Sequence, residues 1–192
     1  MFVFQRFLNA TEPRWTLIER MERAIGASKR DGNMFAILFM DLDGFKVIND
    51  SLGHSTGDEV LKAFALRLLH CVRGRDTVAR LGGDEFVALL ENIATTDDAA
   101  EMADSILSRM RQGLWAEDQP LQVMPSIGIT LFPQDGDTVE ELLKNADAAM
   151  YEAKRGGRGT YRFFEISMNE AATRTLQIQR ALHEALKAGY FS

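Results

Sequence analysis

The sequence predicts an α/β (α+β) domain: a mixed central sheet that contains one antiparallel hairpin and is flanked by helices. Apolar segments of strand length alternate along the chain with longer segments whose apolar residues recur at helical spacing. Two strand segments are separated only by Gly82-Gly83-Asp84-Glu85, which is typical of a hairpin turn. A chain of 192 residues that is 46% hydrophobic and 26% charged is expected to form one globular domain, which excludes a disordered or fibrous protein.

The first two elements are expected to be a helix and a buried strand. Apolar residues at helical spacing predict a helix over residues 14–29, which the group Asp31-Gly32-Asn33 ends. Phe35 to Met40 is a continuous apolar run that stops at Asp41. Its length and its flanking breakers predict a strand that is buried on both faces.

A polar connection through His54 is expected to lead to the next helix. Thr56 and Glu59 have the spacing of a capping box, so Thr56 is the expected N-cap. An apolar stripe follows at helical spacing, formed by Leu61, Phe64, Ala65, Leu68 and Cys71. Residues 78–81 and 86–91 are then expected to be the two strands of the hairpin.

The second half of the chain continues the alternation of helices and strands. We expect helices over 97–114, 138–154 and 169–188, and strands over 122–132 and 160–164. Gly156-Gly157 is expected to end the second of these helices. This order predicts that helices cover both sides of one mixed sheet.

Charge, cysteine content and hydropathy exclude several classes of protein. A net charge of −6 without a block of Lys or Arg argues against nucleic-acid binding. The run 35–40 is too short to cross a bilayer, and residues 1–7 do not resemble a signal peptide. The single cysteine, Cys71, suits a reducing compartment. We therefore expect a cytoplasmic location.

Carboxylates at two places suggest a metal site. Asp41 and Asp43 follow the buried strand, and carboxylates at a strand end can bind a hard cation such as Mg²⁺ together with substrate phosphates. Asp84 and Glu85 would complete a carboxylate cluster if the hairpin lies opposite Asp41, and such a cluster is costly unless it holds cations. The alternative is a solvated strand end next to an ordinary hairpin turn.

Two further groups of residues suggest a nucleotide. Main-chain N–H groups after Asp43 could bind a phosphate if a helix starts there, and Asn49 with Asp58 could read a purine edge. Lys154 and Arg158 could bind phosphates. The alternatives are turn-forming and capping residues for the first group, and cations that stabilise a helix C-terminus for the second.

Together these segments resemble the GGDEF family, the diguanylate cyclases of bacterial signalling. The resemblance covers about residues 15–165 and includes Arg80-Leu81-Gly82-Gly83-Asp84-Glu85-Phe86 and the upstream run from Asp41 to Asp50. Further matching blocks follow in order: Gly53-His54, Gly57-Asp58-Glu59, Ser126-Ile127-Gly128-Ile129, Ala146-Asp147, Met150-Tyr151, Ala153-Lys154 and Gly157-Arg158. The family's fold is palm-like, a ferredoxin-like mixed sheet flanked by helices, so the resemblance implies that fold here.

The resemblance also implies roles for residues at the matching positions. It implies Mg²⁺, with Mn²⁺ as the alternative, held by Asp41, the Leu42 carbonyl, Asp84 and Glu85. It implies catalytic roles for Asp84, Glu85, Lys154 and Arg158. The implied substrate contacts are guanine with Asn49 and Asp58, the triphosphate with the backbone of Asp43, Gly44 and Phe45, and the ribose and α-phosphate with Gly82 and Gly83.

The implied reaction joins two GTP molecules into cyclic di-GMP and releases two pyrophosphates, with a homodimer supplying one GTP from each copy. Arg73 and Asp76 match the family's RxxD site, at which cyclic di-GMP inhibits its own synthesis. The alternative is a non-catalytic module that binds GTP or cyclic di-GMP and controls an adjacent EAL phosphodiesterase domain.

The two ends of the chain depart from the family pattern or extend beyond it. Residues 1–14 are a lead-in in which only Leu8 and Arg14 match the family's usual opening segment, and Gly159 stands where the family usually has Asn. Residues 166–192 resemble the connector that leads to an EAL domain. This predicts a fragment of a larger protein, which other parts could anchor to a membrane.

Overall fold

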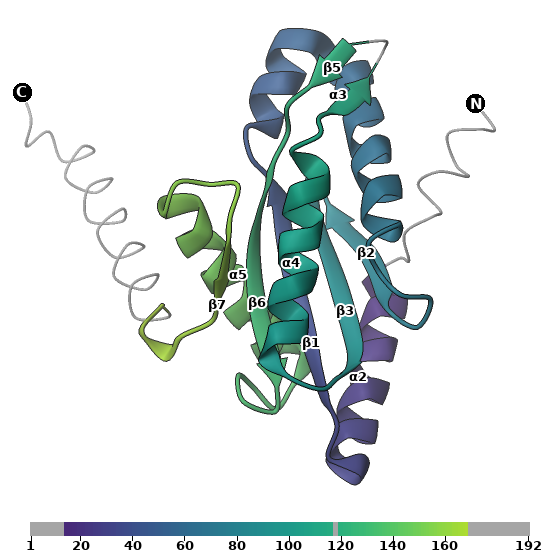
Figure 1. Ribbon diagram of the computed structural model, residues 1–192, viewed down its shortest axis with the longest axis vertical. Helices are drawn as coiled ribbons and strands as arrows, with labels where there is room; N and C mark the ends of the chain where they lie inside the picture. The colour runs from purple at the N-terminus through teal and green to yellow at the C-terminus, as the bar shows by residue number, and fades with distance from the viewer. Residues whose placement is uncertain (1–13, 117–118, 169–192) are drawn as a thin grey trace, which may run out of the picture.

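The computed structural model describes residues 14–116 and 119–168, and in this part of the chain helices cover both faces of one mixed sheet (Figure 1). The α/β fold class predicted from the sequence is confirmed. The elements in chain order are α2 (Arg14–Asp31), β1 (Met34–Leu42), α3 (Phe45–Leu69), β2 (Thr77–Gly82), β3 (Glu85–Ile93), α4 (Thr96–Met110), β4 (Leu114–Ala116), β5 (Gln119–Leu121), β6 (Pro125–Phe132), α5 (Val139–Arg155) and β7 (Tyr161–Phe163).

The buried strand β1 lies at the centre of the sheet, whose strand order is β2-β3-β1-β6-β7. Strands β3 and β6 both pair with β1 in antiparallel fashion, and β6 pairs with β7 in parallel. The predicted hairpin is present as β2 and β3. This order carries the ends of β1, of the hairpin and of α5 toward one end of the molecule.

Both faces of β1 are buried, as its continuous apolar sequence predicts. Ala36, Leu38, Met40 and Leu42 belong to one apolar cluster with residues of α3 and α4. Phe35, Ile37 and Phe39 belong to a second cluster with residues of α2 and α5. Each large side chain buried in this way contributes about 1.5–3 kcal/mol to folding, so β1 is a rigid base for the residues at its end.

Helix α5 packs directly against β6 because β6 has a glycine at the contact. A Cβ on Gly128 would stand 1.9 Å from the Ala146 carbonyl oxygen and 2.3 Å from the Met150 nitrogen. Real Cβ atoms do not come this close to backbone, so only glycine allows the observed packing. The close approach sets the position of the last turn of α5, which carries Lys154.

The expected start of the helix after β1 is wrong. Residues 45–52, expected as part of a connection, are helical, and α3 begins at Phe45 and bends at Gly53, whose φ of 87° is not helical. Glycine accepts this left-handed conformation without the cost that a side chain would add. Thr56 is not an N-cap, because it is buried inside α3 and its hydroxyl donates to the Leu52 carbonyl at 3.0 Å.

Two other boundaries also differ from those expected. Helix α4 ends at Met110 rather than at residue 114, and Leu114 instead opens the small β4–β5 hairpin. The long strand begins at Pro125, not at residue 122. The expected helix over 169–188 and the lead-in up to residue 13 lie outside the described residues. No helix among the described residues is long and apolar enough to span a membrane.

Candidate functional site

The predicted metal-binding carboxylates lie at the end of β1 and at the adjoining β2–β3 turn; β1 runs upward toward α3 in Figure 1. Asp41 is paired in register with Glu85 on β3 and with Ser126 on β6. The hairpin therefore lies opposite Asp41, which is the arrangement on which the carboxylate-cluster prediction depended.

The hairpin turn that carries Asp84 is held by an arginine of β2. Arg80 donates two hydrogen bonds to the Gly83 carbonyl oxygen, from Nε at 2.8 Å and from Nη2 at 2.5 Å. Glu85 is the last hairpin residue that pairs with β1. These bonds fix Asp84 and Glu85 beside Asp41, so the acidic turn is more than a solvated loop.

Three carboxylates in this group have raised pKa values. Burial raises the pKa of Asp84, and the nearby negative charge of Asp41 raises it further. Burial also raises the pKa of Glu85, and Asp147, Asp41 and Asp84 add to the effect. The pKa of Asp147 is raised by burial too, although Lys154 opposes the shift. Carboxylates with raised pKa values at one place favour binding of a cation.

Lys154 supplies a positive charge to this group. Its Nζ lies 2.7 Å from Asp41 Oδ1, and the lysine side chain is only 27% exposed. An ion pair sheltered from solvent in this way is stronger than one on the open surface. Lys154 thus joins the end of α5 to the end of β1 and leaves part of its ammonium group toward solvent.

The oxygens at the end of β1 fit a magnesium ion in their chemistry. The Asp43 N–H donates to the Met124 carbonyl on the β6 side at 2.8 Å. Since successive backbone groups of a strand point to opposite sides, the Leu42 carbonyl faces the hairpin, one residue past the last β1–β3 pair at Asp41. Mg²⁺ takes one or two carboxylates together with substrate phosphates and water.

Across residues 14–116 and 119–168, no group of three or more His, Cys, Asp or Glu side chains is arranged to hold a metal ion by itself. The protein oxygens therefore form part of a coordination shell, which phosphate oxygens and water would have to complete.

The start of α3 offers main-chain donors next to this group. Gly44 is its N-cap and has no side chain with which to cap the helix. The first N–H groups of a helix have no carbonyl to bond within the helix, so a phosphate can accept from them. The Asp43 N–H already donates to the Met124 carbonyl, so of the three predicted phosphate-binding N–H groups only those of Gly44 and Phe45 remain for a phosphate.

The predicted guanine readers Asn49 and Asp58 lie on either side of the bend of α3. A Cβ on Gly57 would stand 1.9 Å from Asn49 Oδ1, so the Asn49 side chain packs directly on this glycine. Asp58 is the next residue, and both Asn49 and Asp58 are half-buried. The bend at Gly53 thus brings the Asn49 amide next to Gly57, the residue before Asp58.

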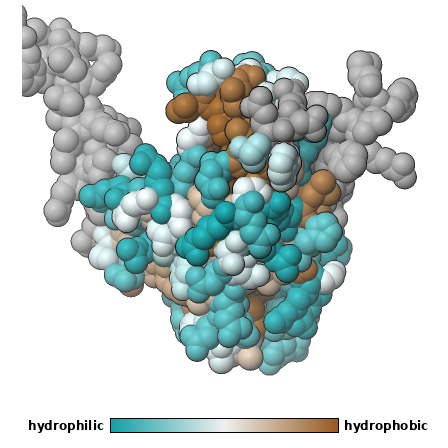
Figure 2. All heavy atoms as spheres, turned by 45° about the horizontal axis from the view of Figure 1, so that its top comes forward, coloured by the Kyte–Doolittle hydropathy of each residue, from teal (hydrophilic) through white to brown (hydrophobic). Residues whose placement is uncertain are grey.

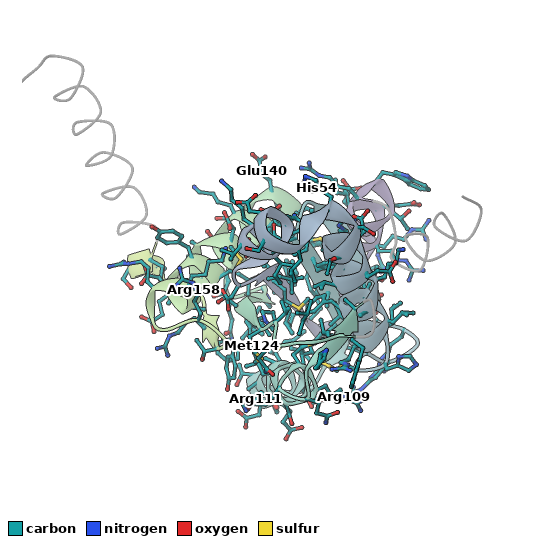
Figure 3. All side chains as sticks on the ribbon, turned by 90° about the horizontal axis from the view of Figure 1, so that it is seen from above. His54, Arg109, Arg111, Met124, Glu140 and Arg158 are labelled. Carbon is teal, nitrogen blue, oxygen red and sulfur yellow. The ribbon has the colours of Figure 1, made fainter. Side chains whose placement is uncertain are left out.

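Asp43 makes contacts that the sequence did not predict. Its carboxylate accepts the Ser126 hydroxyl at 2.9 and 3.0 Å and the Gly159 N–H at 2.9 Å. Arg158 Nε lies 3.9 Å from Asp43 Oδ1. Figure 3, which looks down on this end of the molecule, shows Arg158 on the side where α5 and β7 lie. Asp43 is therefore engaged by donors from β6 and from the turn after α5.

Arg73 and Asp76 lie apart from this site, at the other end of β3. Asp76 accepts the Arg73 N–H at 2.8 Å and the Glu91 N–H at 3.3 Å. Glu91 is separated from Glu85 by about 20 Å along the strand, at 3.3 Å per residue. A surface pocket at this place is lined by Arg73, Asp76, Leu90, Glu91, Ile93, Asp98 and Met102.

One residue of the carboxylate group had no predicted role. Asp147 lies two helical turns before Lys154 on α5, so both residues occupy the same face of the helix. In the sequence, only this spacing indicates that Asp147 belongs with Lys154. It points to the carboxylate group only once α5 is known to pack beside β1.

Comparison with known proteins gives a consistent result. A family model described as "Diguanylate cyclase, GGDEF domain" matches residues 12–160. MucR of Pseudomonas aeruginosa, named a bifunctional diguanylate cyclase/cyclic di-GMP phosphodiesterase, is 48% identical over 174 residues, which are 91% of this chain and 25% of MucR. NbdA of the same organism, named a cyclic di-GMP phosphodiesterase, is 38% identical over 81% of this chain and 20% of NbdA.

A solved structure agrees with the sequence comparisons. The GGDEF domain of TpbB, also called YfiN, from P. aeruginosa has a TM-score of 0.84 at 40% identity, covering 86% of this chain and 97% of that one. Full-length TpbB, named a diguanylate cyclase, is 41% identical over 86% of this chain and 38% of its own length. The chain thus spans between a fifth and two fifths of these three relatives.

Proposed function

Because the chain belongs to the GGDEF family of diguanylate cyclase domains, we propose that it condenses two GTP molecules into cyclic di-GMP. The observation that carries the proposal is the pairing of Asp41 with Glu85 in the hairpin, beside the Lys154 ion pair. Acidic groups and a lysine ammonium thus lie together at the end of one rigid strand, which supports roles in metal and phosphate binding.

The reaction forms two phosphodiester bonds. The 3′-oxygen of each GTP attacks the α-phosphorus of the other, the bond from that phosphorus to the β-phosphate oxygen breaks, and pyrophosphate leaves. Each 3′-hydroxyl gives up its proton as the bond forms. Bound Mg²⁺, held by Asp41, the Leu42 carbonyl, Asp84 and Glu85, would supply charge neutralisation and a lowered pKa for the hydroxyl.

The remaining residues bind and orient the nucleotide in this proposal. Lys154 and Arg158 hold the phosphates, with the Gly44 and Phe45 N–H groups at the start of α3. Asn49 and Asp58 read the guanine edge, while Gly82 and Gly83 leave room for the ribose and α-phosphate. Since GTP is a cytoplasmic substrate, this activity requires that the domain face the cytoplasm.

A second copy of the chain is needed because each copy binds one GTP. Large apolar side chains are exposed on two of the elements: Val47 and Leu52 on α3 and Trp115 on β4. Figure 2 shows apolar residues gathered at the upper end of a mostly hydrophilic face. Exposed apolar surface near the site supports a homodimer in which two sites face each other.

Product analysis tests the proposed reaction. The protein is incubated with GTP and Mg²⁺ at high concentration, and the products are identified by mass spectrometry. We expect cyclic di-GMP from the unaltered chain, none from Asp84→Ala and none with excess EDTA. Asp104→Ala removes an exposed carboxylate of α4 and is expected to keep activity. GTP binding without any product from the unaltered chain would contradict the proposal.

A second candidate function is a regulatory module that binds nucleotide without cyclising it. The observation that favours it is the name of NbdA, a phosphodiesterase whose matching region corresponds to this chain. In that case residues 15–165 would form the binding domain, and 166–192 would lead to an EAL domain that GTP binding controls. This candidate would be supported if a chain that contains the EAL domain bound GTP but formed no cyclic di-GMP.

A further inference from the structure

The negative charge of Asp43 is unfavourable for a nearby triphosphate unless other groups offset it. The proposed triphosphate site is at this end of the molecule, and a free carboxylate there would repel phosphate. Its side chain is 10% exposed and is surrounded by the Ser126 hydroxyl, the Gly159 N–H and the Arg158 guanidinium. Hydrogen bonds to a carboxylate from such donors disperse its negative charge. Asp43 thus behaves as an internal anchor and not as an open metal ligand.

The segment that Asp43 anchors is the turn between α5 and β7. Arg158 and Gly159 have φ values of 63° and 56°, so two consecutive residues are left-handed. A residue with a side chain rarely takes this conformation and costs of order 1 kcal/mol when it does. Such a turn persists only when contacts hold it in place.

Hydrogen bonds hold this turn on both sides of the strained residue. The Arg158 N–H donates to the Ala153 carbonyl at 3.2 Å, which ties the turn to the end of α5. The Gly159 N–H donates to Asp43 at 2.9 Å, which ties it to the end of β1. Ser126, fully buried on β6, fixes the other side of the carboxylate. Asp43 is therefore one of the groups that fix the backbone on either side of Arg158, together with the Ala153 carbonyl and the Ile127 N–H, which donates to the Thr160 carbonyl at 3.0 Å.

The side chain of Arg158 remains available for a ligand. Its Nε is 3.9 Å from Asp43, which is beyond hydrogen-bond distance, and the side chain is 66% exposed. Electrostatic attraction to the Asp43 carboxylate limits the directions in which the Arg158 side chain points. It leaves the guanidinium N–H groups able to donate to a ligand. Lys154, four residues earlier, is fixed on Asp41 in the same region.

We propose that the Asp43 carboxylate is a positioning residue that holds the Arg158 turn against β1 and β6, so that Arg158 meets the triphosphate of the bound nucleotide. The inference rests on the proposed function, since it assumes a guanosine triphosphate at this end of the molecule. It adds a role for the Asp43 side chain, which is distinct from metal binding.

The test compares two nucleotides that differ in their phosphates. The probes are a GTP analogue with a methylene group between the α- and β-phosphorus, which cannot be cyclised, and GMP. Affinities are measured with Mg²⁺ for the unaltered chain, Asp43→Asn, Arg158→Ala and the double variant. Asp137→Asn, an exposed aspartate, is the matched control.

We expect Asp43→Asn and Arg158→Ala each to lower the affinity for the analogue by about tenfold, because each variant loses one charge-assisted contact. The double variant should bind no more than about twofold worse than either single variant, because both remove the same contact. GMP affinity should stay unchanged. Independent, multiplying losses would overturn the proposal, and so would an equal loss of GMP affinity.

A second measurement does not depend on the nucleotide. Hydrogen exchange of the Gly159 amide, followed by NMR, should accelerate in Asp43→Asn and, to a smaller degree, in Ser126→Ala, which removes one donor and preserves the carboxylate. Unchanged exchange would refute the anchoring. If exchange accelerates but the unaltered chain does not bind the analogue, the proposed function fails and the anchoring of the turn stands.

Discussion

At the scale of single residues, the carboxylates at the end of β1 are of two kinds. Asp43 is engaged by protein donors, whereas Asp84 and Glu85 lie near other carboxylates and have raised pKa values. The sequence motifs predicted the second kind, because closely spaced acids are visible in the chain. They did not predict the partners of Asp43, because Ser126 and Gly159 lie 83 and 116 residues away in the sequence.

The raised pKa of Asp84 predicts that its charge destabilises the fold. The folded protein holds the Asp84 proton more tightly than the unfolded chain does. The stability contributed by this group is therefore fully present below the unfolded pKa and is lost as pH rises through the higher folded pKa. At neutral pH we expect Asp84→Asn to raise Tm by about 2 °C while abolishing product formation. Thermal unfolding with and without Mg²⁺ measures this.

The same experiment contains its own control. Mg²⁺ should raise the Tm of the unaltered chain, because it offsets the repulsion among Asp41, Asp84 and Glu85, and it should raise that of Asp84→Asn less. Asp104→Asn should match the unaltered chain in both conditions. A lower Tm for Asp84→Asn without Mg²⁺ would show that repulsion does not dominate at this carboxylate.

A residue-scale prediction also concerns the pocket at the other end of β3. Arg73→Ala removes the cationic side chain of this pocket and leaves the end of β1 untouched. If the pocket binds cyclic di-GMP, this variant should lose product binding by at least about tenfold and keep its GTP affinity. Calorimetric titration with each nucleotide measures the two affinities. Loss of both would mean that the two sites are not separate.

At the scale of elements, the packing of α5 on β6 positions Lys154. Gly128 permits this contact, and α5 in turn carries Asp147 and Lys154 to the end of β1. Alternation of apolar segments predicted both elements, but their close approach depends on the absence of one side chain. The start of α3 shows the same limit, since the capping-box spacing of Thr56 and Glu59 predicted a boundary that the bend at Gly53 replaces.

Substitution of Gly128 should therefore damage stability and site together. A Cβ at this position would collide with the backbone of α5, so we expect Gly128→Ala to lower the free energy of unfolding by about 2–4 kcal/mol. Urea unfolding measures the change. Gly74→Ala, where a Cβ meets no atom within 4 Å, is the matched control and should be close to neutral. Equal stability of the two variants would refute the tight α5–β6 contact.

At the scale of the whole molecule, the sheet separates two regions with different proposed ligands. The end of β1 collects the groups for GTP and a metal, and the far end of β3 carries the Arg73 pocket. The fold class was predictable from the alternation of segments, and the palm-like mixed sheet followed from the family resemblance, whereas the strand order was not predicted. Neither indicates how two copies pair, because that depends on surfaces such as those around Val47 and Trp115.

Pairing of two copies predicts an unusual dependence on protein concentration. Each copy supplies one GTP, so the rate per unit protein should rise with concentration below the dimerisation constant and level off above it. Initial rates over a wide dilution series measure this. A rate strictly proportional to concentration throughout that range would mean that one chain is sufficient.

The ratio of the two products tests the proposed condensation of GTP into cyclic di-GMP most directly. Pyrophosphate and cyclic di-GMP are quantified in the same reaction with GTP and Mg²⁺, for the unaltered chain, Asp84→Ala and Asp104→Ala. We expect two pyrophosphates for each cyclic di-GMP from the unaltered chain and Asp104→Ala, and neither product from Asp84→Ala. Cyclic di-GMP formed at the same rate by Asp84→Ala, or pyrophosphate released without cyclic di-GMP, would contradict it.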